Sequence, residues 1–172
     1  MSEYLVESKS RKDIRLIAEG FRELFNLENE VWVPIVKLLD AMLLVFDNFS
    51  YEIVPDDIFP PNIHAETDIR TGHIQIKDSV FERACAGEGR DRMTIAHEIG
   101  HFITLCFFGF KLQRNMNQVP IKTFNDPEWQ AKCFAGELMV SARLTEGMSP
   151  VEIMKACGVS EDAATYQYNH RD

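Results

Sequence analysis

Apolar residues recur at helical spacing along most of the chain. Between residues 10 and 26 they fall three or four positions apart, and charged residues occupy the opposite side, which predicts an amphipathic helix. A second helix is predicted over 33–43, because a proline occupies its first turn. A third is predicted over 126–143, where an acidic cap precedes a proline. Two shorter helices are expected, one from residue 148 and one over 161–168.

The stretch between the second helix and the most apolar helix has the period of β-strands. Residues 63–68 and 73–77 flank Arg70-Thr71-Gly72, and this pattern predicts a hairpin with a glycine turn. Residues 51–54 predict a further short strand, and 80–84 predict a short helix. Helices combined with a small sheet predict an α+β fold.

The most apolar helix is predicted to begin near Arg90 and to end at Gly109, and residues 111–124 behind it are polar and irregular. Apolar side chains lie almost all round this helix, so we expect it to be buried. Polar residues interrupt it in the sequence His97-Glu98-Ile99-Gly100-His101. Buried histidines and a buried glutamate need partners or they reduce stability, which argues against two unconnected histidines on a surface helix.

This H-E-x-x-H motif has the spacing of a metal site. Four residues of an α-helix turn the chain by about 400°, so His97 and His101 project from one face and can both bind a single Zn²⁺. Glu98 points about 100° away around the helix. It can flank the metal without ligating it, where a base that activates a water molecule belongs.

A catalytic zinc usually has three protein ligands, so a third donor is needed. The helix over 126–143 offers Glu128 and Glu137, which lie about 180° apart, and only one of them can face the core beside the small residues Ala131 and Ala135. The pattern favours Glu128, either as the ligand or as a first-turn glutamate that favours the helix dipole. The remaining histidines are weaker candidates, two because they lie in predicted strands and one because it lies close to residue 172: His64, His73 and His170.

Composition narrows the class of protein. The 172 residues, 45% apolar and 26% charged, are typical of one globular domain, which we divide into a helical N-terminal extension (1–45) and a core (46–172). The net charge of −9 argues against a nucleic-acid-binding surface. Four cysteines without a C-x-x-C pair, no charged apolar leader and no apolar run long enough for a bilayer together indicate a soluble cytoplasmic protein.

Two segments resemble those of a known family. Residues 94–101 (T-I-A-H-E-I-G-H) are similar to the T-L-A-H-E-L-G-H segment of the ImmA/IrrE metallopeptidases. Residues 128–139 (E-W-Q-A-K-C-F-A-G-E-L-M) are similar to the family's E-x-[EQ]-A-x-x-F-A-x-E-L-L segment. The order and spacing of the segments also fit, and the resemblance extends over residues 50–165.

The resemblance implies a compact zincin-like domain, with a small sheet packed on a buried motif helix and other helices around it. It implies a zinc peptidase with His97, His101 and Glu128 as metal ligands and Glu98 as the catalytic base. Family members come often from phage, mobile elements or stress regulons, and several cleave or antagonise helix-turn-helix repressors. A transcriptional repressor is therefore the expected protein substrate.

Two other functions stay open at this stage. One is a regulator that binds a repressor without cutting it and whose zinc site is structural or vestigial; the intact Glu98 favours catalysis over this alternative. The other is a zinc hydrolase of small molecules. The sequence does not identify the group that stabilises the oxyanion, for which the candidates are Tyr51, Tyr166, Tyr168 and His170.

Overall fold

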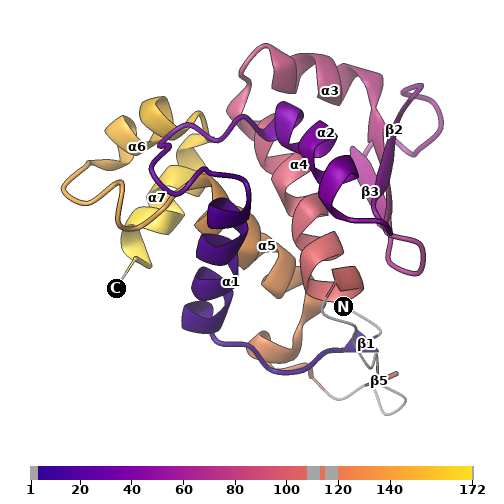
Figure 1. Ribbon diagram of the computed structural model, residues 1–172, viewed down its shortest axis with the longest axis horizontal. Coiled ribbons are helices and arrows are strands. Elements are labelled where there is room, and N and C mark those ends of the chain that lie inside the picture. Colours follow the sequence, from indigo (N-terminus) through magenta and orange to yellow (C-terminus); the bar gives the residue numbers. More distant parts are fainter. Residues whose placement is uncertain (1–3, 108–112, 115–119, 172) are drawn as a thin grey trace.

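Two helices that pack against each other form the centre of the protein: α4 (Gly89–His101) and α5 (Pro127–Met139) (Figure 1). The computed structural model describes residues 4–107, 113–114 and 120–171. At the crossing of the two helices, a Cβ atom added to Gly100 would lie 2.6 Å from the carbonyl oxygen of Ala131. The absence of a side chain at Gly100 therefore brings the two backbones together next to His101.

The predicted start of α5 is confirmed. The Asp126 side chain accepts a hydrogen bond from the backbone N–H of Glu128, and Pro127 occupies the first helical position. The helix ends at Met139, four residues before the predicted end. The motif helix differs from the prediction, because its α-helical part ends at His101 and continues as a π-helix, Phe102–Phe107. Gly109, the predicted stop, lies outside the described residues.

A mixed three-stranded sheet lies beside α4. Its order is β2 (Ser50–Val54), β4 (His73–Lys77), β3 (Ala65–Asp68). The predicted hairpin is confirmed: β3 and β4 are antiparallel, with Asp68 opposite His73, and Gly72 in the turn has a φ of +76°. Strand β2 runs parallel to β4. Strand β3 is thus an edge strand of the sheet, and it packs against α4.

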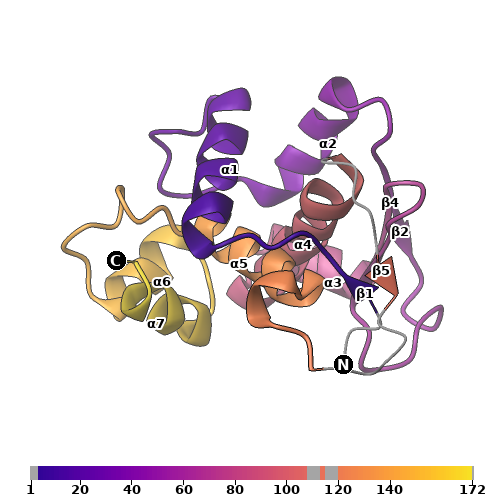
Figure 2. The ribbon, with the colours of Figure 1, turned by 90° about the horizontal axis from the view of Figure 1, so that it is seen from below.

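The other helices surround this centre, and in both views the sheet lies at one end of the molecule and α6 and α7 at the other (Figure 1, Figure 2). They are α1 (Arg11–Leu24), α2 (Ile35–Val45), α3 (Asp78–Cys85), α6 (Pro150–Cys157) and α7 (Glu161–Asn169), with a short 3₁₀ turn at Thr123–Asn125. The fold class is α+β, as predicted.

One short pairing was not predicted. Strands β1 (Tyr4–Leu5) and β5 (Gln113–Arg114) pair in antiparallel fashion. Strand β5 falls in the stretch 111–124, for which the sequence predicted only irregular structure. Residues 111–112 and 115–119 of that stretch lie outside the described residues.

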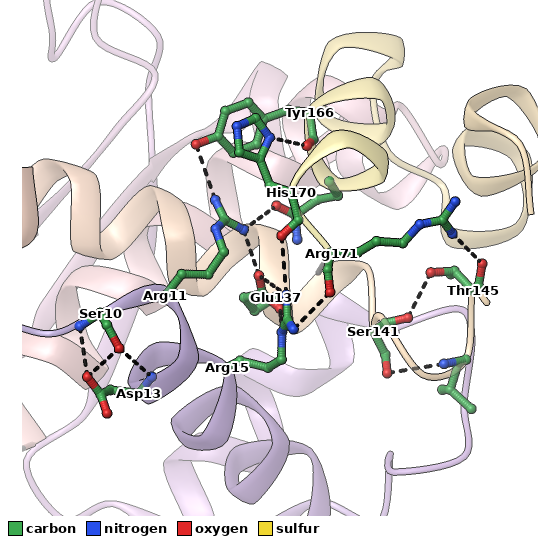
Figure 3. A network of polar contacts seen from close by, with 12 residues as sticks. Ser10, Arg11, Asp13, Arg15, Glu137, Ser141, Thr145, Tyr166, His170 and Arg171 are labelled. Atoms are coloured by element: carbon green, nitrogen blue, oxygen red, sulfur yellow. Dashed lines mark hydrogen bonds and ion pairs between the residues drawn. The ribbon is translucent and has the colours of Figure 1, made fainter. Parts of the chain in front are cut away.

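The buried carboxylate of Glu137 links α5 to α1, and the arginines that bind it also reach α7 and Arg171 (Figure 3). Arg11 and Arg15 of α1 donate to the two oxygens of Glu137, at 2.6 and 2.8 Å. Arg11 also donates to the side chain of Gln167 in α7, and Arg15 to the backbone carbonyl of Arg171. Helix α5 is therefore fixed between α4 on one side and α1 and α7 on the other.

This arrangement corrects the expectation that Glu128, rather than Glu137, is the acidic residue of α5 that faces the core. The Glu137 side chain is 1% exposed, whereas that of Glu128 is 51% exposed. Other helices cover both faces, and Glu137 is the residue that faces the interior of the protein.

One apolar cluster joins the helices that precede residue 46 to the elements that follow it. It includes fully buried side chains from α2, α4, α5 and the sheet, among them Met42, Ile99, Phe134 and Ile74. Among the described residues, no helix combines the length and the apolar character needed to cross a membrane.

Candidate metal centre

The two histidines of the motif helix meet at its last turn. The Nε2 atoms of His97 and His101 are 3.1 Å apart, and the two rings are nearly perpendicular, with an interplanar angle of 80°. Both side chains are largely shielded from solvent, with 21% and 12% of their surface exposed. Two imidazole nitrogens therefore converge on one point, as the i, i+4 spacing predicts.

Glu128 supplies a carboxylate at the same point. Its Oε2 lies 3.4 Å from the Nε2 of His97, and its Oε1 lies 3.3 Å from the Nε2 of His101. Bonds of about 2.0–2.1 Å in a tetrahedral arrangement separate neighbouring ligand atoms by roughly 3.3–3.4 Å. The His–His distance and the distance from each imidazole to the nearer Glu128 oxygen are of this size, and the three residues form a cluster that could hold a metal ion.

The charges in the cluster are strongly coupled. Hydrogen bonds from His101 and His97 hold the pKa of Glu128 well below its usual range. Burial by itself lowers the pKa of His101, but the hydrogen bond to Glu128 and the negative charges of Glu98 and Glu128 outweigh burial and raise it. One ionised carboxylate and two imidazoles are a donor set that suits Zn²⁺.

One ring nitrogen of His101 that faces away from the cluster has no hydrogen-bond partner among the described residues. This nitrogen, Nδ1, is buried. A metal-bound histidine usually donates its second ring N–H to a carboxylate, a carbonyl or a water molecule. No acceptor among the described residues therefore fixes the tautomer of His101 from outside the cluster.

Glu98 lies beside the cluster and is anchored to the sheet. It is only 7% exposed, and its Oε2 accepts a hydrogen bond of 2.6 Å from the hydroxyl of Thr67 in β3. The Thr67 hydroxyl also lies 3.2 Å from the backbone carbonyl oxygen of Glu98. Sequence reasoning did not identify Thr67, because it precedes Glu98 by 31 residues and only the sheet-to-helix packing brings them together.

The cluster opens onto two adjoining clefts with volumes of about 700 and 380 Å³. Both are lined by His97 and Glu98, by Ala65 at the start of β3, and by Ile63 just before it. The smaller one also contains His101 and Glu128. The structure thus brings all four predicted site residues together at a groove that follows an edge strand.

The candidates for an oxyanion donor lie elsewhere. The Tyr166 hydroxyl accepts a hydrogen bond from Arg11, and the ring of His170 stacks on that of Tyr166. Tyr168 carries the guanidinium of Arg171 over its ring. Tyr51 donates its hydroxyl proton to Asp40. Among the described residues that line the two clefts, these four are not present.

The two hairpin histidines have different surroundings. His73 bonds through Nδ1 to the Ser50 hydroxyl and lies 3.3 Å from Glu52 on the sheet. His64 lines the larger cleft, although its place in the predicted hairpin had favoured a strand-surface residue.

Comparisons of the chain with models of protein families, with curated proteins and with solved structures found no match. Membership of a family therefore stays a prediction from the two motif segments.

Proposed function

We propose that the protein is a zinc-dependent endopeptidase with a zincin-like active site. The observation that carries this proposal is the His97–His101–Glu128 cluster, with Glu98 beside it at the edge of a cleft. The two imidazole Nε2 atoms are 3.1 Å apart, and each lies 3.3 to 3.4 Å from a different oxygen of Glu128. The resemblance of residues 94–101 and 128–139 to the ImmA/IrrE metallopeptidases supports the same function. The edge strand β3 next to the cluster offers backbone groups with which an extended peptide is able to pair.

The chain's own residues divide the chemical work among them. When bound, a zinc ion acts as a Lewis acid toward a carbonyl oxygen and lowers the pKa of water toward about 7. Glu98 takes the proton of the attacking water and passes it to the departing amine. Its Oε2 accepts from Thr67, which leaves Oε1 to carry the proton. The wall of the cleft at Ile63 and Ala65 positions the peptide backbone across the cluster.

The resemblance also points to the substrate and the setting. We propose a protein substrate, such as a helix-turn-helix repressor, in the cytoplasm of a cell that carries a phage, a mobile element or a stress regulon. The net charge of −9 fits a partner of this kind, because DNA-binding proteins carry basic surfaces.

The Glu98→Gln variant tests the hydrolytic function. The substituted glutamine keeps the shape of the side chain and an oxygen for Thr67, but it cannot accept the proton of water. We expect the zinc-loaded variant to retain its metal and its fold and to lose cleavage of an unfolded protein such as casein by about 10²- to 10⁴-fold. Fragments are measured by mass spectrometry. Undiminished cleavage by this variant would overturn the mechanism.

Two variants that each remove a carboxylate from the same cleft test whether Glu128 binds the metal. Glu128→Ala removes a ligand, and we expect its zinc affinity to fall by more than the roughly 10- to 100-fold that loss of an outer partner costs. Glu66→Ala removes an exposed carboxylate that lines the cleft but is outside the cluster, and its zinc affinity is expected to stay unchanged.

The alternative is a regulator that binds a repressor without cutting it. If the wild-type protein binds a repressor and leaves it intact, the result favours this binding-only regulator.

A further inference from the structure

The larger cleft carries positive charge in an otherwise acidic protein. Arg90 and Lys132 line it, and both are exposed. The acidic residue of the described lining is Glu98, which is buried and bonded to Thr67. The smaller cleft instead contains Glu66 and Glu128. The groove is therefore basic at one end and acidic at the other, although the chain has a net charge of −9.

The two cations come from the two helices that also supply the metal cluster. Arg90 precedes His97 by seven residues in α4, or about 10 Å along the helix axis. Lys132 follows Glu128 by four residues in α5, or about 6 Å along the axis. Both cations lie on the His97 side of the groove, because they line the cleft that His101 and Glu128 do not line. Their distance from the cluster is thus fixed by two packed helices.

Neither cation has a side-chain partner in the part of the chain that the structure describes. Within the described residues, the side chains of Arg90 and Lys132 form no ion pair and no hydrogen bond, whereas Arg11, Arg15 and Arg83 all bind carboxylates. Two unpaired cations at the wall of a cleft are available to an anionic ligand.

We propose that Arg90 and Lys132 form a specificity subsite that binds an aspartate or glutamate side chain of the peptide, on one side of the bond to be cut. That this subsite lies beside a bond to be cut rests on the proposed peptidase function. Ile63, Met93 and Ala135 provide apolar contacts for the methylene groups of that side chain. The preferred substrate segment is acidic on the side that lies over His97 and need not be acidic on the other.

Peptide binding to the non-cleaving, zinc-loaded Glu98→Gln protein tests the subsite apart from catalysis. The probes are short fluorescent peptides of one sequence with Glu, Gln or Lys at a single position, moved stepwise along the peptide. Affinity is measured by anisotropy at low and high salt. We expect Glu to improve affinity about tenfold over Gln at low salt, in one half of the peptide only, with most of the gain lost at high salt.

A pair of charge-reversal variants separates the subsite from overall charge. Arg90→Glu with Lys132→Glu is expected to abolish the preference for Glu and to favour the Lys peptide. Lys37→Glu with Lys155→Glu changes the net charge equally at exposed positions in α2 and α6, and it is expected to leave the preference intact. Equal affinity for Glu and Gln peptides, or an equal effect of both double variants, would overturn the proposal.

Cleavage of the same peptides by the protein with Glu98 intact decides the proposed function separately. An acidic preference in binding without any cleavage would support the subsite and contradict the peptidase. Cleavage with no dependence on the peptide's charge would support the peptidase and contradict the subsite.

Discussion

At the scale of single residues, the hydroxyl of Thr67 is the polar contact between the sheet and the proposed base. It donates to Glu98 at 2.6 Å from an edge strand, while Glu98 itself belongs to the motif helix. A glutamate side chain has several rotamers, and a hydrogen bond from a fixed backbone element selects one of them. In the proposed mechanism Thr67 is therefore a positioning residue, which acts on the reaction through Glu98.

Thr67→Val removes the hydroxyl and keeps the shape of the side chain. A hydrogen bond to a charged group contributes about 1.5–3 kcal/mol, so we expect kcat to fall by about 10- to 100-fold, with KM and zinc content nearly unchanged. Thr67→Ser restores the donor and should recover most of kcat. Steady-state kinetics with one peptide substrate measure both. A loss in KM alone, or no recovery in the serine variant, would assign Thr67 to substrate binding or to packing.

Single residues differ in how far the sequence reveals them. His97, Glu98 and His101 follow from helical spacing alone, because their relation is local. Periodicity left Glu128 with two interpretations, and the family resemblance favoured the ligand. The crossing of α4 and α5 places its carboxylate beside both histidines. Lys132 lies one helical turn from Glu128 and Arg90 lies two turns from His97, so helical periodicity relates both cations to the cluster. Thr67 had no local signal.

At the scale of elements, the crossing of α4 and α5 fixes the cluster. Gly100 lies between the two helices' backbones, where a Cβ atom would come within 2.6 Å of the Ala131 carbonyl oxygen. Glu128 is three residues before Ala131 on the same helix. Any displacement of α5 at this crossing therefore moves a proposed ligand away from the other two.

Gly100→Ala should separate the helices. Overpacking at a close contact costs typically about 1–3 kcal/mol, and we expect a loss of stability in that range together with weaker zinc binding. Urea unfolding and a competing chelator measure the two effects. Gly20→Ala is the matched control, because no atom lies within 4 Å of the added Cβ in α1; it is expected to stabilise the protein by roughly 0.5–1 kcal/mol. If both variants behave alike, the crossing is not what positions Glu128.

Element boundaries were predictable where a side chain sets them. Ser10 caps α1 and Asp126 caps α5, and both caps satisfy N–H groups that are otherwise unpaired. The end of α4 at His101 was not predictable, because the apolar residues that follow have the same pattern in an α-helix and in a π-helix. The parallel pairing of β2 with β4 depends on tertiary contacts that local alternation does not encode.

At the scale of the whole molecule, the Glu137 cluster joins segments from both ends of the sequence (Figure 3). Its buried carboxylate forms ion pairs with Arg11 and Arg15 of α1, and Arg11 also donates a hydrogen bond to the side chain of Gln167 in α7. Removing one partner of a buried ion pair leaves uncompensated charge in a poorly solvated place. The cluster therefore makes the packing of α1, α5 and α7 mutually dependent.

Glu137→Gln tests this dependence. It leaves two arginines without a counterion, and we expect the free energy of unfolding to fall by about 3–5 kcal/mol, with α1 and α7 losing protection from hydrogen exchange together. Glu23→Gln, an exposed change in the same α1, should alter stability by less than about 0.5 kcal/mol. Loss of protection in α1 alone would show that α7 is held by other contacts.

The same cluster bears on how the chain is made in the cell. Arg15 finds its carboxylate partner 122 residues further along, and a carbonyl partner 156 residues further along. A ribosome therefore releases α1 well before α5, the helix that packs along it, has been synthesised. Until then the part of its apolar side that α5 covers, including the contact of Phe21 with Phe134, stays open to other proteins. Chaperones that act on emerging chains are expected to bind this helix, and to release it once α5 has packed against it.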